Sequence, residues 1–284
     1  MRRTTLAAGV LVLFISAISV SQQPPKPPPP SAEVPDLQTS KAVIVCVDCD
    51  KPFDTETHKK VLEGLLSNPY VGELRKALYL QDTLHQFESK VHFDNCHFDG
   101  ATSYVNDRLK EAGRYVAFAE RAKTTGDKAA LERHVQSAFF TLGQALHGVQ
   151  DFYAHSNYVE LTNKAVKRVD EWEIIMPWRD SGRSRIKELQ GKGLVSGFVF
   201  WGFPQQCPTG TMSHEDLAKD SETTRSGRVR IPHLQNLTQY RAAVFLAREA
   251  SQEFLKDAFS RWPLLKEVNG ENVAFEVLVD RRSM

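Results

Sequence analysis

Leu146–Leu161, LHGVQDFYAHSNYVEL, is the most informative stretch of the chain. His147, Asp151 and His155 are spaced four residues apart in it, which places them on successive turns of one helix face. From Phe139 to Val159, Asp151 is the only formally charged side chain, although 25% of all residues are charged. The stretch therefore predicts a buried helix that carries one carboxylate between two histidines.

The helix has two distinct faces. At 100° per residue, an apolar stripe lies well away from the face of His147, Asp151 and His155. The stripe consists of Val135, Phe139, Leu142, Leu146, Val149 and Tyr153. The histidine face lacks the Lys, Glu and Arg of a solvated surface, so we expect it to be covered by the protein as well.

A covered carboxylate needs a cationic partner, since burying it alone costs several kcal/mol or forces protonation. No Lys or Arg lies nearby in the sequence, so metal coordination is favoured. His147 and His155 are about 12 Å apart along the axis, too far for one ion to reach all three side chains comfortably. Asp151 is expected to bridge two ions, with each histidine serving a different one.

Other segments supply further ligands for such a multinuclear site. DTETHKKVLEGLL contributes His58, and VHFDNCHF contributes His92, Asp94 and His97. CPTGTMSHEDLAKDSE contributes His214, Glu215, Asp216 and Asp220. Each alone would be an ordinary surface residue, but together they offer the nitrogen and oxygen ligands of zinc hydrolytic sites. The motifs HExxH, GxSxG and GxxxxGK[ST] are absent, which excludes zincin, α/β-hydrolase and P-loop assignments.

The periodicity predicts a mainly α protein with one helical domain, short β segments and a long irregular excursion. Helices are expected over approximately 54–66, 70–91, 104–123, 128–155 and 235–262. The excursion covers 179–232 and contains a strand-like run at 194–201, and further short strands are expected at 42–47 and 272–279.

The N-terminus predicts export. Residues 1–21 have the layout of a secretory signal peptide, residues 22–36 form a proline-rich tether, and residues 37–284 form the domain. A secreted or periplasmic protein is expected, with an uncleaved membrane anchor as the less favoured alternative. Export permits disulfides, which we expect at Cys46–Cys49 and Cys96–Cys207. The alternative for the CxxC pair Cys46/Cys49 is a metal or redox pair. The net charge of +1 gives no reason to expect binding to duplex nucleic acid.

The segment FFTLGQALHGVQDFYAHSNYVEL resembles the central motif of the Het-C family, which also occurs in von Willebrand factor A domain-containing protein 7. Weaker family-like pieces follow the expected order: THKKV at Thr57, HFDN at His92, and the run from Cys207 to Asp220. The resemblance covers approximately residues 52–260. The Het-C family is in turn distantly similar to the superfamily of zinc-dependent phospholipase C and P1 nuclease.

That similarity implies a helical fold of phospholipase C/P1 nuclease type with a cluster of two or three Zn²⁺ ions that hydrolyses phosphate esters. It implies that Asp151 is the bridging ligand. The further ligands that it implies are His58, His92, Asp94, His147, His155, His214 and Asp220. Two features depart from the superfamily pattern. A tether precedes the domain where those enzymes have an N-terminal Trp ligand, which His58 would replace, and the gap between Asp151 and His155 is shorter.

The expected function is a secreted zinc-dependent phosphoesterase, most similar to a phospholipase C, in which Asp94 and Asp151 are the catalytic carboxylates. Phospholipid or another phosphodiester would be the substrate, with peripheral membrane contact through the aromatic residues of 198–203 unless that run is a buried strand. Two alternatives remain open: a non-catalytic, metal-stabilised recognition or incompatibility domain, and a P1-like single-strand nuclease.

Overall fold

A computed structural model describes residues 57–58 and 70–268 of the chain. The described part is mainly helical, as predicted. Its α-helices are α2 (Val71–Leu84), α3 (Ser89–His92), α4 (Phe98–Thr125), α5 (Lys128–His155), α6 (Tyr158–Thr162), α7 (Asp180–Gly191), α8 (His214–Leu217), α9 (Gln239–Arg261) and α10 (Pro263–Val268). The short 3₁₀ helices are η1 (Asn163–Ala165), η2 (Val169–Glu171) and η3 (Pro232–Leu234), and the antiparallel strands are β1 (Arg230–Ile231) and β2 (Leu237–Thr238).

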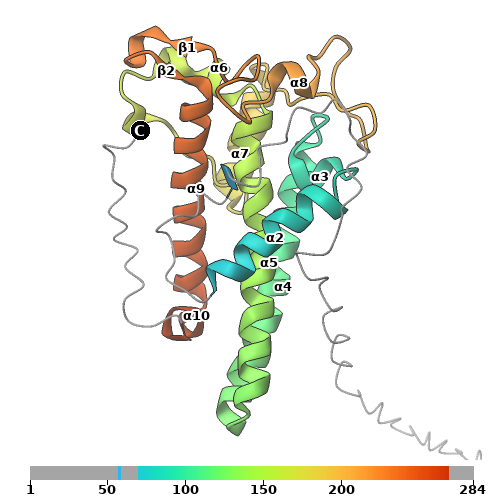
Figure 1. Cartoon of the computed structure of the whole chain (residues 1–284), viewed down its shortest axis with the longest axis vertical. Coiled ribbons are helices and arrows are strands. Elements are labelled where there is room, and N and C mark those ends of the chain that lie inside the picture. The colour runs from blue at the N-terminus through green and yellow to red at the C-terminus, as the bar shows by residue number, and fades with distance from the viewer. Residues whose placement is uncertain (1–56, 59–69, 269–284) are drawn as a thin grey trace, which may run out of the picture. The chain divides into compact units, whose positions relative to one another are not determined.

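The long helix α5 is the central element, and α2, α4 and α9 all pack against it (Figure 1). The tight turn between α4 and α5 has a clear local cause. Gly126 ends α4 with a left-handed φ of 75°, and the carboxylate of Asp127 caps α5 by accepting a hydrogen bond from the backbone N–H of Ala130. The turn lies between the helices predicted over 104–123 and 128–155, as expected.

The predicted apolar stripe of α5 is confirmed, since all six of its residues are buried in the hydrophobic core. The covered opposite face is confirmed as well. From Ala145 to Ser156 every residue is buried, because neighbouring segments surround this end of the helix on all sides. Only the first turns of α5 present the polar face that a surface helix normally has.

The helix predicted over 104–123 begins earlier than expected, at Phe98, and two further predicted elements differ from the structure. The helix predicted over 70–91 is interrupted after Leu84, because Glu88 takes an extended conformation before the short helix α3. The excursion contains the helix α7, and the run at 194–201 is a loop with isolated bridges at Ser196 and Phe198 in place of a strand.

The predicted disulfide Cys96–Cys207 is confirmed, and it joins the turn before α4 to the excursion. Several other predictions lie outside the described residues: the signal peptide, the tether, the Cys46–Cys49 bridge, the two outer strands and most of the helix over 54–66. Within that last helix, Thr57 and His58 are described and are helical. Across 57–58 and 70–268, none of the helices has both the length and the hydropathy that crossing a bilayer requires.

Candidate metal centre

The last turns of α5 place His147, Asp151 and His155 in the interior, where all three side chains are buried. Oδ2 of Asp151 lies 2.9 Å from Nε2 of His147 and 3.8 Å from Nδ1 of His155. The central carboxylate therefore lies between the two histidines, as the four-residue spacing predicts.

A first group of side chains surrounds His147 and Asp151. Nε2 of His58 lies 3.5 Å from Oδ1 of Asp151, and Nδ1 of His92 lies 3.1 Å from Oδ2 of the same carboxylate. Asp82 completes the group, with one oxygen 3.5 Å from Nε2 of His147 and the other 3.8 Å from Nε2 of His58. These residues come from four separate segments of the chain.

A second group surrounds His155. Nδ1 of His214 lies 3.0 Å from Oδ1 of Asp94, and the same oxygen of Asp94 is 3.6 Å from Nδ1 of His155. Asp220 faces both histidines, at 3.4 Å from Nε2 of His155 and 3.8 Å from Nε2 of His214. Asp151 contacts members of both groups, and the backbone carbonyl of His92 lies 3.1 Å from Nδ1 of His155.

The spacing of these atoms fits a bound metal ion. Nδ1 of His92, Nε2 of His147 and Oδ2 of Asp151 lie 2.9 to 3.1 Å from one another. Two ligands of a tetrahedral zinc ion with bonds of about 2 Å are about 3.3 Å apart. Three sets of three residues bring one ligand atom each within 4.8 Å of the others: His58–His147–Asp151, Asp82–His92–His147, and Asp94–His155–His214.

The hydrogen-bonding pattern supports the same conclusion. Nε2 of His92, Nε2 of His155 and both carboxylate oxygens of Asp220 are buried and accept or donate no hydrogen bond within the described residues. Buried polar atoms are normally satisfied, so these are candidates for ligand atoms. Among the described residues, Asp94, Asp151 and Asp220 form ion-pair contacts with histidines alone, so no Lys or Arg offsets their charge.

The buried environment shifts the pKa values of the three residues on α5. Burial lowers the pKa of His147 to about 3, which keeps its imidazole neutral at pH 7. Burial by itself raises the pKa of Asp151, but contact with the imidazoles of His147 and His155 brings it well below its ordinary value. Burial opposes protonation of His155, yet the charges of Asp151, Asp94 and Asp220 raise its pKa well above the ordinary value.

Asn95 fixes the turn that carries His92 and Asp94. Its side-chain amide donates to Ser89 Oγ and to the carbonyl oxygens of Val199 and Gly202, and its Oδ1 accepts from the N–H of Val199. Asn95 itself has a left-handed φ of 55°, a conformation that asparagine tolerates better than most residues. The turn is therefore attached firmly to the loop at 196–203.

Lys219 fixes the segment that carries Asp220. Its side chain is fully buried, and its ammonium group donates to the carbonyl oxygens of Ser156 and Leu217. A carboxylate oxygen of Glu160 lies 3.1 Å from the same nitrogen. Because Ser156 is the cap residue directly after the C-terminus of α5, this buried cation also compensates the negative end of the helix dipole.

The second group is the more accessible one, since the side chain of His214 is 21% exposed whereas those of His58 and His147 are at most 1% exposed.

Exposed apolar side chains belong to the loops next to the second group. The backbone N–H of Phe198 donates to Met212, the carbonyl of Phe198 accepts from His214, and Phe203 pairs with Phe87. Phe200 and Phe203 are 72% and 67% exposed, so this part of the loop is not a buried strand.

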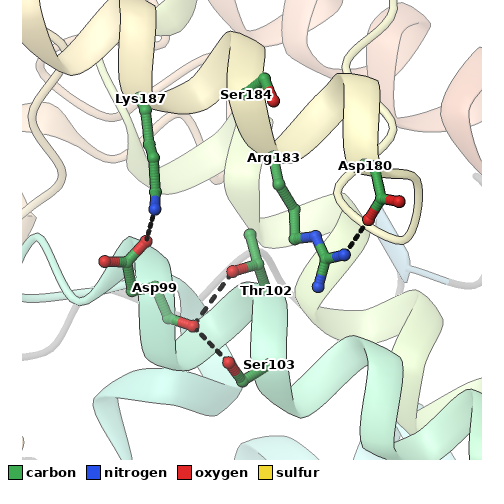
Figure 2. Close-up of a pocket in the computed structure, with 7 residues that line it drawn as sticks. All are labelled: Asp99, Thr102, Ser103, Asp180, Arg183, Ser184 and Lys187. Atoms are coloured by element: carbon green, nitrogen blue, oxygen red, sulfur yellow. Dashed lines mark hydrogen bonds and ion pairs between the residues drawn. The ribbon is translucent and has the colours of Figure 1, made fainter.

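A separate pocket of about 480 Å³ lies between α4 and α7 (Figure 2). Figure 2 shows the ammonium group of Lys187 directed at Asp99 and the guanidinium group of Arg183 directed at Asp180. The hydroxyls of Thr102 and Ser103 donate to the backbone carbonyl of Asp99. The pocket contains none of the predicted ligands, and its four charged side chains form two ion pairs, Lys187–Asp99 and Arg183–Asp180.

All eight residues predicted as metal ligands converge in the two groups. Asp82 is an addition that the sequence reasoning missed. A signal for it exists, because Leu74, Leu78 and Asp82 are four residues apart and the two leucines are buried, so Asp82 continues an apolar stripe. His85, His134 and His233, expected to be ordinary, lie outside both groups: His85 pairs with Glu88, His134 packs near Phe118 and His233 contacts the carbonyl of Asn163.

Comparison with known proteins gives one result on this region. No curated protein and no solved structure matches the chain. Residues 70–169, which include Asp82, His92, Asp94 and the three ligand candidates of α5, match the family model of the VWA7 N-terminal domain, a family related to Het-C-like proteins.

Proposed function

We propose that this protein is a zinc-dependent phosphoesterase, most similar to a phospholipase C, with two or three Zn²⁺ ions at the buried His/Asp centre. The observation that carries the proposal is the convergence of five histidines and four aspartates with several unsatisfied ligand atoms. Mixed imidazole and carboxylate ligands suit zinc.

The ligand residues would bind metal on two sides of Asp151, according to the two groups in which they lie. His58, Asp82, His92 and His147 would hold metal on one side of Asp151, and Asp94, His155, His214 and Asp220 on the other. Bound zinc supplies Lewis acidity, which polarises a phosphate oxygen and makes water a stronger nucleophile at neutral pH. The carboxylate of Asp151 contacts both groups and would keep them at a fixed separation.

Asp94 is the carboxylate best placed to handle a proton. It belongs to the more accessible group and contacts His214, the most exposed of the predicted ligands. We therefore assign to Asp94 the orientation of the attacking water and the acceptance of its proton. Asp151 is fully buried, so its part is to hold the metal ligands in place.

The exposed aromatic loop favours a lipid substrate over a nucleotide. Phe200 and Phe203 lie on a loop that Asn95 binds to the same turn as Asp94, so their position relative to the centre is fixed. Protruding apolar side chains near a reaction centre suit an acyl-chain surface. The net charge of +1 provides little attraction for the phosphates of a nucleic acid.

The test is hydrolysis by the zinc-loaded full chain of two substrates, a short-chain phosphatidylcholine and a single-stranded oligonucleotide. Asp94→Asn and Asp151→Asn are the test variants, and Asp107→Asn, which changes an exposed carboxylate on α4, is the matched control. We expect lipid cleavage by the wild type and the control that both test variants lose. Cleavage of the oligonucleotide alone would favour a nuclease, and bound zinc without either activity would favour a metal-stabilised recognition domain.

A further inference from the structure

A chain of three hydrogen bonds links α9 to His58 at the centre. The hydroxyl of Ser251 donates to the backbone carbonyl of Ala247 at 2.7 Å. The side-chain nitrogen of Gln150 donates to Ser251 Oγ at 3.0 Å, and Nδ1 of His58 lies 2.6 Å from Oε1 of Gln150. Both Gln150 and Ser251 are fully buried, and the three hydrogen bonds join protein atoms directly.

The direction of each hydrogen bond follows from the one before it. A carbonyl oxygen can only accept, so the single proton of the Ser251 hydroxyl is used on Ala247. Ser251 Oγ must then accept from Gln150, which requires the amide nitrogen of Gln150 to face Ser251. The amide oxygen consequently faces His58, and an oxygen acceptor requires that Nδ1 of His58 carries the proton.

A neutral imidazole with its proton on Nδ1 has its lone pair on Nε2. In His58 that nitrogen is the one facing the centre, at 3.5 Å from Asp151 and 3.8 Å from Asp82. We infer that Gln150 and Ser251 are positioning residues that fix the tautomer of His58, so that its Nε2 is ready to bind the metal. The inference rests on the proposed metal centre and goes beyond it, because neither residue is itself a ligand.

The sequence position of Gln150 explains how α5 supplies both metal ligands and the residue that orients His58. Gln150 directly precedes Asp151 on α5, so it points to a neighbouring side of the same buried turn. Ser251 lies on α9, which packs against α5. This packing brings Ser251 within hydrogen-bonding distance of Gln150. Partners of this kind orient ligating histidines in many metal sites, and their loss typically lowers metal affinity about 10- to 100-fold.

The experiment measures two quantities on the full chain: the tautomer of His58, from the nitrogen-15 and carbon-13 shifts of its ring, and the affinity for zinc. The His58 signals are identified by their loss in His58→Gln. The variants are Ser251→Ala, Gln150→Leu and Gln150→Glu, and the last keeps an oxygen acceptor for Nδ1. Thr141→Ala is the control, since Thr141 is also buried on α5 but its hydroxyl donates to Ser137.

We expect the Nδ1–H tautomer in the wild type, in Thr141→Ala and in Gln150→Glu. Ser251→Ala and Gln150→Leu should give a mixture of tautomers and about 10- to 100-fold weaker zinc binding. An unchanged tautomer in both of these variants, or an affinity loss without a tautomer change, would overturn the inference. If Gln150→Leu does not fold, Ser251→Ala decides. If the wild type binds no zinc, the proposed function fails, while the tautomer in the metal-free protein still tests the hydrogen-bond chain.

Discussion

Oδ2 of Asp151 lies 2.9 Å from Nε2 of His147, one helical turn earlier on α5, and both side chains are at most 1% exposed. A contact of this kind is costly in the interior, because each group must lose its hydration. The same oxygen is 3.1 Å from Nδ1 of His92, so the carboxylate contacts two imidazoles at once. A cation among these atoms would offset the cost, which is why we regard Asp151 as the centre of the metal site.

Asp82→Asn should weaken zinc binding although Asp82 belongs to none of the recognised motifs. The substitution keeps the shape of the side chain and removes the negative charge that faces His58 and His147. We expect affinity to fall about 10- to 100-fold, as for other perturbed metal sites. Zinc titration followed by calorimetry measures it, with Asp99→Asn as the exposed control on α4. Equal affinities for both variants would remove Asp82 from the centre.

Lys219→Met should destabilise the protein and also disturb the second group. The substitution leaves the carbonyl oxygens of Ser156 and Leu217 without their donor and Glu160 without its cation. We expect the free energy of unfolding to decrease by about 3 kcal/mol. Urea titration provides the measurement, and Lys192→Met, on an exposed lysine, should change stability by no more than about 0.5 kcal/mol. A Lys219→Met protein as stable as the control would contradict the positioning role.

The metal-free protein should lose stability as the pH falls from 6.5 towards 3. Burial lowers the pKa of His147 to about 3, so in this range the unfolded chain binds a proton that the folded protein does not. The slope from this residue is at most about 1.4 kcal/mol per pH unit. Urea unfolding in the presence of a chelator measures it, and His147→Asn should flatten the slope. A slope that this substitution leaves intact would show that His147 is not the cause.

His155 should make the metal-free protein less stable as the pH rises above 6.5, whereas His147 lowers stability as the pH falls. Burial disfavours its charged form, but contacts with Asp151, Asp94 and Asp220 raise its pKa well above 6.5. The stability that it contributes is therefore fully present below pH 6.5 and is lost as the pH rises through the folded-state pKa. We expect the stability of metal-free His155→Asn to fall less between pH 6.5 and 9 than that of the wild type. Parallel curves for the two proteins would refute this assignment.

Replacing Phe200 and Phe203 together by serine should separate membrane contact from chemistry. Both side chains are exposed, and within the described residues neither forms a hydrogen bond or an ion pair with a ligand residue. The zinc content of the double variant should therefore equal that of the wild type. We expect at least a tenfold loss of activity on phosphatidylcholine vesicles and little change on a short-chain monomeric lipid, since only the vesicle offers an apolar surface. Equal losses on both substrates would mean that the loop serves the reaction itself.

Much of the candidate centre was predictable, because its geometry is encoded locally in α5. The spacing of His147, Asp151 and His155 and the lack of charge around them were sufficient to predict a buried carboxylate between histidines. The start of α5 follows from the Gly126–Asp127 turn, because a glycine and a capping aspartate at these positions are visible in the sequence. Residue types in separate segments made five further residues candidates, and the family resemblance then implied them as ligands: His58, His92, Asp94, His214 and Asp220.

What could not be predicted depends on contacts between distant segments. Asn95 determines the path of the loop at 196–203 through bonds to Val199 and Gly202, and no local pattern encodes them. The strand expected at 194–201 was wrong for this reason. Its backbone pairs with other segments only at isolated bridges, at Ser196 and Phe198, and the backbone of Val199 bonds to the side chain of Asn95. The role of Gln150 depends on Ser251 of α9, which is a hundred residues away in the chain.

The most direct test of the account is the metal content of the purified full chain, measured by mass spectrometry for the wild type, Asp151→Asn and the control Asp107→Asn. We predict two or three zinc ions per chain in the wild type and the control, and loss of most of this metal in Asp151→Asn. A wild-type protein that holds no metal after purification in zinc-containing buffer, or an Asp151→Asn protein that retains all of it, would contradict a centre built on this carboxylate.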